Sequence, residues 1–347
     1  MGLIDRFSRD MGIDLGTANT LVFVSNGEAI LDEPSVVAID KNTQEVLATG
    51  QQAKAMLGRT PDSITALRPL RDGVIADFDS AELMLQQFLR QALGGRSLVR
   101  PRLVIGIPSG VTGVERRAIL EAASQAGARE VYAIDEPVAA AIGAGLPVEE
   151  PVGHLVVDIG GGTTEVTVLS LQGTVLSESV RVAGDDLSEA IAQYLKKVHN
   201  LVVGERTAED IKIQLGSAYP SDGDSEREMA VRGLHLLSGL PRNVTLKAPE
   251  IRESLSEPLT AIVEAVKRTL ERIPPELSAD IINHGIVLTG GGALLDGLDT
   301  LISHETGVVT HVASDPLRCV VLGTSRVLDR FGEAQLNRLF SERVREG

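Results

Sequence analysis

The sequence predicts an α/β protein of two lobes, each beginning with a short β-meander. Two lobes are expected because 347 residues exceed what one hydrophobic core usually holds. Strand-like and helix-like segments alternate along the chain, which is typical of an α/β architecture. Residues 11–17 (MGIDLGT) and 156–164 (VVDIGGGTT) nearly repeat each other, each with an apolar strand, an Asp, a glycine-rich turn and Thr. This repeat indicates an internal duplication.

Antiparallel strands are predicted to follow each Asp motif. In the first half, apolar runs at 20–24, 29–31 and 35–39 are separated by turn residues, among them Asn26-Gly27, a dipeptide that indicates a hairpin. The second half repeats the pattern and turns at Gln172-Gly173. Because each motif opens a meander, it differs from the strand-to-helix turns of P-loop and dinucleotide-binding proteins.

Several helices are predicted between and after the meanders. Ser80 is expected to cap one helix, and further helices are expected over 115–126 and 138–144. Apolar residues at helical spacing over 251–273 predict one helix with a buried face. The acidic, Gly-containing segment 220–228 is expected to be a solvated loop.

The composition excludes several classes of protein. A formal net charge of −15 argues against a duplex-DNA binder and against simple electrostatic capture by anionic lipid. The one cysteine, Cys319, lies in an apolar stretch and is expected to be buried filler, so a disulfide and a Cys-rich metal site are both excluded. The N-terminus lacks the apolar stretch of a secretory signal, and the run 138–146 is about half a membrane span.

Asp14 and Asp158 are the strongest candidates for chemistry. Each precedes a tight glycine-rich turn, and such turns expose backbone N–H groups that suit phosphate oxygens. An Asp beside the turn can hold Mg²⁺, usually through water. Thr17, Thr163 and Thr164 add hydroxyl groups. One Asp-x-Gly alone would indicate an ordinary turn, but two matched copies in matched contexts favour a nucleotide–Mg²⁺ site.

Two further segments carry polar or glycine-rich patterns. Residues 286–295 (IVLTGGGALL) predict a strand, a glycine turn and a helix start, an arrangement that can receive a nucleotide. Asp135 and Glu136 place carboxylates at the start of a helix. Such a carboxylate is either a partner of the helix dipole or a group that orients an attacking water, and composition does not choose between these roles.

These three glycine motifs resemble the phosphate-1, phosphate-2 and adenosine motifs of the actin-like ATPase superfamily. The similarity is densest to the MreB family of bacterial actins and extends from Asp10 to about Leu328, although Asp135 stands where that family usually has Glu. The segments that carry it are 13–20, 32–39, 56–61, 72–78, 114–118, 136–147, 204–209, 274–277 and 288–295.

The resemblance implies an actin-like ATPase fold, with two duplicated RNase H-like lobes around a nucleotide cleft. Each lobe would contain two subdomains. They are IA at 1–32, 78–147 and 315–347; IB at 33–77; IIA at 148–180 and 247–314; and IIB at 181–246.

The resemblance also implies the role of each site residue. Asp14 and Asp158 would organise Mg²⁺, largely through water, and Glu136 would position the hydrolytic water. The residues that would contact ATP are Gly16, Thr17, Ala18, Asn19, Gly160, Gly161, Gly162, Thr163, Glu209, Lys212, Thr289, Gly290, Gly291, Gly292 and Ala293.

Members of this family hydrolyse ATP or GTP slowly and polymerise in the nucleotide-bound state. The resemblance therefore implies paired protofilaments in the cytoplasm, at the inner face of the cell membrane, with MreC, MreD and RodZ-type elongation proteins and peptidoglycan synthases as partners. A sugar kinase would need a catalytic base beside a sugar pocket, and no such candidate stands out. A chaperone would need a substrate-binding domain after the ATPase.

Two regions are candidates for membrane contact. Leu3, Ile4 and Phe7 could share one face of a short N-terminal helix, and Leu98 and Val99 resemble the apolar loop of the family. A disordered terminus and a plain surface loop are the alternatives. In the tail, Leu336, Leu339, Phe340 and Val344 would line one face of a helix, which would either pack on the body or contact a partner or membrane.

Overall fold

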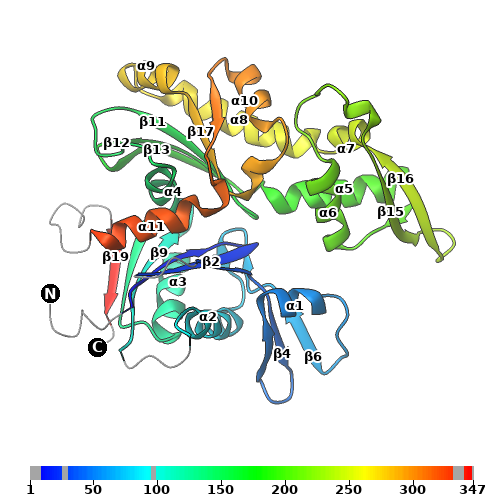
Figure 1. Ribbon diagram of the computed structural model, residues 1–347, viewed down its shortest axis with the longest axis horizontal. Helices are drawn as coiled ribbons and strands as arrows, with labels where there is room; N and C mark the ends of the chain where they lie inside the picture. Colours follow the sequence, from blue (N-terminus) through cyan, green and yellow to red (C-terminus); the bar gives the residue numbers. More distant parts are fainter. Residues whose placement is uncertain (1–8, 26–29, 95–98, 331–339, 346–347) are drawn as a thin grey trace. The chain divides into compact units, whose positions relative to one another are not determined.

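The computed structural model describes residues 9–25, 30–94, 99–330 and 340–345 (Figure 1). Its chain divides into two compact units. The first comprises Met1–Val152, Leu169–Val175 and Leu317–Gly347, and the second comprises Gly153–Val168 and Leu176–Pro316. Each unit has its own large cluster of buried apolar side chains, as the length of the chain predicts.

A six-stranded sheet organises the first unit. Its order is β19-β10-β9-β1-β2-β3, in which β1, β2 and β3 form the predicted antiparallel meander. The turn residues Asn26 and Gly27 lie outside the described residues. The strands are β1 (Met11–Leu15), β2 (Asn19–Val24), β3 (Ile30–Pro34), β9 (Arg102–Ile107), β10 (Glu130–Asp135) and β19 (Phe340–Arg345).

Three strands of this sheet run parallel, and this direction places the site residues. β9 pairs in parallel with β1 on one side and with β10 on the other. The carboxyl ends of β1 and β10 therefore lie at one edge of the sheet. Asp14 is near the end of β1, and Glu136 directly follows β10, so both residues are at this edge.

Helices and smaller sheets complete the first unit. Helix α2 starts earlier than predicted, because Asp77 accepts a hydrogen bond from the Ser80 N–H at 3.0 Å and is itself the cap. Helix α11 packs along α4 (Figure 1). The remaining elements are α1 (Gly50–Met56), α2 (Phe78–Ala92), α3 (Gly113–Gln125), α4 (Glu136–Ala144), α11 (Cys319–Asp329), β4 (Val37–Asp40), β5 (Val46–Thr49), β6 (Ile64–Leu67), β7 (Leu70–Arg71) and β8 (Val74–Ile75).

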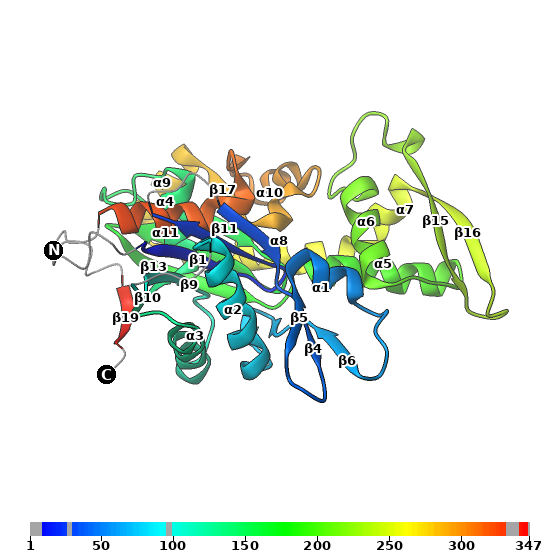
Figure 2. The same ribbon diagram turned by 60° about the horizontal axis from the view of Figure 1, so that its bottom comes forward.

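The prediction of a helical tail is wrong where the structure describes the tail. Strand β19 pairs antiparallel with β10, from Glu130↔Arg345 to Ile134↔Phe340 (Figure 2). The physical reason is that β10 would otherwise present an open sheet edge with unpaired backbone groups. The Phe340 ring lies 5.0 Å from the Tyr132 ring, which adds an aromatic contact to the ladder.

A five-stranded sheet with the order β13-β12-β11-β17-β18 organises the second unit. Strand β17 runs parallel to β11 and to β18. The strands are β11 (His154–Ile159), β12 (Thr164–Ser170), β13 (Gly173–Val180), β17 (Ile286–Thr289) and β18 (Thr310–Val312). The helices are α5 (Gly184–Val198), α6 (Glu205–Leu215), α7 (Ala248–Ser254), α8 (Ser256–Arg272), α9 (Pro275–His284) and α10 (Leu298–Thr306).

A second, three-stranded sheet of this unit lies beside α5 to α7. It consists of β14 (Leu201–Val202), β15 (Glu228–His235) and β16 (Pro241–Lys247), and β15 and β16 form a long ribbon (Figure 2). Among the residues that the structure describes, none of the helices is long and apolar enough to span a membrane.

The single helix predicted over 251–273 is two helices, α7 and α8, which meet at Leu255. Pro258 accounts for the break, because proline has no N–H to donate to the carbonyl of Ser254 four residues earlier. The apolar stripe nevertheless stays in the core, since Ile251, Leu255 and Ile262 are all buried.

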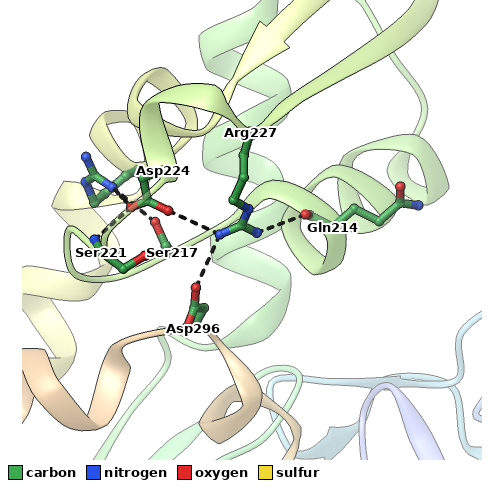
Figure 3. Close-up of polar contacts among 7 residues, drawn as sticks. Gln214, Ser217, Ser221, Asp224, Arg227 and Asp296 are labelled. Carbon is green, nitrogen blue, oxygen red and sulfur yellow. Dashed lines mark hydrogen bonds and ion pairs between the residues drawn. The ribbon is translucent and has the colours of Figure 1, made fainter.

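The segment 220–228 is not simply a solvated loop. Residues Asp224–Glu226 form a turn of 3₁₀ helix, and Asp224 is only 4% exposed. The Asp224 carboxylate pairs with Arg252 and Arg227, and Arg227 also reaches Asp296 at 3.2 Å (Figure 3). These partners come from α7 and from the turn before α10, so the segment joins separate parts of the second unit.

Candidate functional site

The predicted site residues fall into two sets, one in each unit. Asp14, the turn after β1 and Glu136 belong to the first unit. Asp158, the turn after β11, Glu209, Lys212 and the third glycine turn belong to the second.

The turn after β1 is held in shape by neighbouring hydrogen bonds. The Ser35 hydroxyl donates to the Gly16 carbonyl at 2.6 Å, and the Ser35 N–H donates to the Ala18 carbonyl at 2.9 Å. A Cβ at Gly16 would lie 2.6 Å from the Asn19 carbonyl oxygen, so only glycine fits this tight turn. Thr17 is buried, and its hydroxyl accepts a hydrogen bond from the Gly73 N–H at 3.0 Å.

Glu136 packs over Gly106 of β9, where any residue with a side chain would crowd it. A Cβ at Gly106 would come within 3.0 Å of the Glu136 Cγ and 2.9 Å of the Val320 Cγ1. Because Gly106 lies between the strands that lead to Asp14 and to Glu136, its lack of a side chain leaves room for the buried Glu136 carboxylate at this sheet edge.

Close packing of α11 fixes the elements that carry Asp14 and Glu136. Two glycines allow α11 to contact α4: a Cβ at Gly143 would overlap the Cys319 carbonyl, and one at Gly323 would overlap the Ala139 carbonyl. A third, Gly12 on β1, faces the Thr324 side chain of α11. Helix α11 therefore supports both β1 and α4.

In the second unit, Asp158 and Thr289 are directly paired. They face each other in the register of β11 and β17, and the Thr289 hydroxyl donates to the Asp158 carboxylate at 2.6 Å. Both residues are buried. Burial raises the pKa of the Asp158 carboxyl, and the hydrogen bond from Thr289 offsets only part of the rise.

The third glycine turn packs against the second. Gly290 has a φ of +79°, and a Cβ there would overlap the backbone of Ile159. A Cβ at Gly292 would overlap the Ile159 side chain. These glycines let two segments that are distant in sequence lie in contact beside Asp158, which places Thr289, Gly290, Gly291, Gly292 and Ala293 next to the turn 160–163.

The turn after β11 is anchored on the first turn of α5. The Gly160 N–H donates to the Thr163 carbonyl at 2.9 Å and closes the turn. The N–H groups of Gly184 and Asp185 donate to the carbonyls of Gly160 (3.1 Å) and Gly161 (2.7 Å). The turn thus has a fixed conformation against the N-terminus of a long helix.

Glu209 and Lys212 form an ion pair beside the same helix. The Lys212 Nζ lies 2.7 Å from the Glu209 Oε2 and donates to the Gly184 carbonyl, also at 2.7 Å. The Ser188 hydroxyl donates to the Glu209 Oε2 at 2.6 Å. Lys212 therefore connects α6 to the residue that holds the turn 160–163.

Asp158 offers one carboxylate ligand to a metal, and this suits a hydrated Mg²⁺. In the part of the chain that the structure describes, no group of three or more His, Cys, Asp or Glu side chains could cage a metal without other ligands. Mg²⁺ commonly binds through one or two carboxylates together with water and phosphate oxygens. A nearby cation would also stabilise the ionised form of the buried Asp158 carboxylate, which burial disfavours.

The predicted membrane-contact residues are mostly outside the described parts of the chain. Leu3, Ile4, Phe7 and Leu98 all lie there, and Val99 is half-buried.

Sequence reasoning missed several residues that shape the site: Ser35, Gly73, Gly106, Gly184 and Ser188. Each acts through contacts with residues distant in sequence. Only Asp72-Gly73, a dipeptide typical of turns, carried a local pattern that could have drawn attention to it.

Comparison with known proteins finds relatives whose names agree on one family. A family model described as MreB/Mbl protein matches residues 8–336. The cell shape-determining protein MreB of Escherichia coli (strain K12) is 55% identical over 329 residues, covering 93% of this chain and 94% of that protein. The cell shape-determining protein Mbl of Bacillus subtilis (strain 168) is 48% identical over 333 residues, covering 96% and 99%.

Solved structures agree with the fold. The crystal structure of MreB5 of Spiroplasma citri bound to ADP is 36% identical, has a TM-score of 0.87, and covers 95% of this chain and 98% of its own. The AMPPNP-bound form of the same protein also has a TM-score of 0.87. The fold is therefore the actin-like ATPase fold.

Proposed function

The chain belongs to the MreB/Mbl family, and we propose on that basis that it is a cell-shape-determining bacterial actin. In this proposal it binds ATP with Mg²⁺, hydrolyses the nucleotide slowly to ADP and phosphate, and polymerises in the ATP-bound state. The filaments organise lateral peptidoglycan synthesis. In this proposal the subdomains are IA at 1–32, 78–147 and 315–347, IB at 33–77, IIA at 148–180 and 247–314, and IIB at 181–246.

The observation that carries the proposal is the contact between two glycine turns in the second unit. The Thr289–Asp158 hydrogen bond and the packing of Gly290 and Gly292 on Ile159 bring a phosphate-type turn and an adenosine-type turn together. One such turn is common in α/β proteins. Two of them in contact, with the Asp158 carboxylate beside both, support nucleotide binding. Nucleotide-bound S. citri MreB5 supports the same assignment.

In hydrolysis, the residues of this chain hold the nucleotide and orient the attacking water. The turns at 16–19 and 160–163 hold phosphate oxygens through backbone N–H groups, and Glu209 and Lys212 face the nucleoside. The Glu136 carboxylate accepts a hydrogen bond from the attacking water, and aligns it with the γ-phosphate. Asp14 and Asp158 would hold Mg²⁺ largely through water, and the bound ion would supply positive charge beside the phosphates.

An apolar surface at the end of the β15–β16 ribbon supports self-association. Val202, Leu234 and Pro241 are direct cross-strand neighbours on the exposed face of the three-stranded sheet. The turn beyond them exposes Leu237 by 78% and Leu240 by 65%. Such a patch is typical of a protein contact, and a head-to-tail contact that does not close gives a polymer.

The position of the filaments and their partners follow from the family proposal. Paired protofilaments lie in the cytoplasm at the inner face of the cell membrane, held by many weak contacts that include Leu3, Ile4, Phe7, Leu98 and Val99. MreC, MreD and RodZ-type elongation proteins connect them to the wall synthases.

Electron microscopy of the protein on a lipid monolayer, with and without ATP–Mg²⁺, tests this proposal. Paired filaments that form on lipid only with nucleotide support it. Dispersed particles under all conditions, from protein that binds nucleotide, would favour a soluble ATPase or kinase instead.

A further inference from the structure

Ser188 on α5 makes a short hydrogen bond to a carboxylate on a different helix. Its hydroxyl lies 2.6 Å from the Glu209 Oε2 and 3.2 Å from the Gly184 carbonyl. A hydroxyl has one proton, and the shorter bond to an ionised carboxylate is the stronger of the two. Ser188 is only 4% exposed, so it offers little surface for direct contact with a ligand.

The bond from Ser188 adds a buried contact to the Glu209–Lys212 ion pair. The Glu209 side chain is 36% exposed, and an ion pair at such a site contributes little by itself because water screens it and both side chains are long. The bond from Ser188 gives the Glu209 Oε2 a second fixed donor, one that comes from the buried face of α5. Glu209 is thereby held between α5 and Lys212.

The same contacts extend to the turn 160–163. The Lys212 Nζ donates to the Gly184 carbonyl, while the Gly184 N–H donates to the Gly160 carbonyl at 3.1 Å. Gly184 is thus bonded on one side to the ion pair and on the other to the turn. A Cβ on Gly184 would lie 3.1 Å from the Gly160 carbonyl oxygen and 3.5 Å from the Lys212 Nζ, so these groups are closely packed.

We propose that Ser188 is a positioning residue for nucleotide binding, acting through Glu209. It fixes the carboxylate that faces the nucleoside in register with the turn that holds the phosphates. Ser188 does not touch the nucleotide itself. The inference rests on the proposed function, because it assumes that Glu209 and Lys212 face a bound nucleoside.

The test measures the affinity of the full-length protein for ATP–Mg²⁺ by calorimetry, together with the turnover rate at saturating ATP. We expect Ser188→Ala to weaken binding about tenfold, the loss typical of one hydrogen bond to a charged group, with turnover at saturation unchanged. Ser188→Cys keeps the size of the side chain but is a weak donor, so it should weaken binding similarly if Ser188→Ala fails to fold.

A double-mutant cycle separates positioning from a general structural effect. If Ser188 acts through Glu209, Ser188→Ala should add almost nothing to the loss caused by Glu209→Gln. The matched control is Thr269→Val, because Thr269 is also buried in a helix of the second unit and its hydroxyl donates to the Ala265 carbonyl at 2.9 Å. Thr269→Val should leave the affinity for ATP unchanged.

The outcomes are distinguishable. Wild-type affinity in folded Ser188→Ala or Ser188→Cys, with weakened binding in Glu209→Gln, would overturn the role of Ser188 and leave the proposed function intact. Additive losses in the double variant would also overturn it. If the wild-type protein does not bind ATP–Mg²⁺ at all, both the proposed function and the role of Ser188 fail.

Discussion

The Thr289 hydroxyl donates a 2.6 Å hydrogen bond to the Asp158 carboxylate, and this bond joins two strands that are far apart in sequence. The Asp158 carboxylate is buried, and burial raises its pKa. The register Asp158↔Thr289 makes the bond a direct consequence of how β11 and β17 pair. The Asp motif and the third glycine turn are therefore one structural feature.

Thr289→Val should weaken both folding and nucleotide binding. The substitution keeps the shape of the side chain but removes the donor, so a buried carboxylate loses its partner at a cost of about 1–3 kcal/mol in the free energy of unfolding. Urea denaturation and ATP–Mg²⁺ titration measure the two effects. The control is Thr260→Val, because the Thr260 hydroxyl is exposed and donates to the Ser256 carbonyl of its own helix. Equal stability of the two variants would contradict this role of Thr289.

Gly106→Ala should lower ATP turnover while sparing nucleotide binding. The added Cβ would lie 3.0 Å from the Glu136 Cγ and displace the carboxylate that we propose aligns the attacking water. A displacement of this kind can reduce turnover at least about tenfold. Phosphate release at saturating ATP measures the effect. Gly113→Ala places a Cβ where no atom lies within 4 Å and should leave turnover unchanged. Unreduced turnover in Gly106→Ala would show that Glu136 does not depend on this space.

Asp224→Asn should destabilise the second unit in a pH-dependent way. Burial alone would raise the pKa of Asp224, but hydrogen bonds from Ser221 and the ion pair with Arg252 outweigh it and lower the pKa (Figure 3). The folded-state pKa is thus below the unfolded one. The ionised carboxylate therefore stabilises the fold above about pH 4, and this contribution is lost as the pH falls through the folded-state pKa.

Chemical denaturation at several pH values measures this contribution. Removing one partner of a buried pair should cost about 3 kcal/mol at pH 7, and the difference from wild type should shrink below about pH 4. Glu305→Gln is the control, since Glu305 pairs with Lys267 at an exposed site and should matter far less. A difference that stays constant down to pH 2 would mean that the Asp224 charge does not contribute.

Leu237→Asp together with Leu240→Asp should prevent polymerisation without changing nucleotide affinity. Both side chains are exposed on the turn of the β15–β16 ribbon, so burying carboxylates in a contact there would be unfavourable. Light scattering after addition of ATP–Mg²⁺ measures assembly. Leu171→Asp replaces a comparably exposed leucine on another turn and serves as the control. Normal assembly of the double variant would remove this surface from the contact.

Local patterns predicted the elements that carry the site. The apolar runs that contain Asp14 and Asp158 form the expected strands β1 and β11, and the run that ends at Thr289 forms β17. These segments are determined by alternation and by glycine turns, which depend on near neighbours in sequence.

The features that the sequence did not predict depend on distant contacts. The tail forms β19 because β10 offers an open edge, which local helical spacing at Phe340 and Val344 does not reveal. Asp224 is buried because Arg252 and Asp296 belong to segments that fold back toward it. The roles of Gly106 and Ser188 likewise depend on Glu136 and Glu209, which only the tertiary structure brings close.

Sedimentation tests the central claim, that nucleotide binding at the paired Asp motifs drives polymerisation. Purified protein is centrifuged at high speed with ATP–Mg²⁺, with ADP–Mg²⁺ and without nucleotide. The protein should pellet with ATP–Mg²⁺ and stay in the supernatant without nucleotide, and Asp158→Asn should stay in the supernatant throughout. Wild-type protein that binds ATP–Mg²⁺ yet remains in the supernatant at every concentration would contradict the claim.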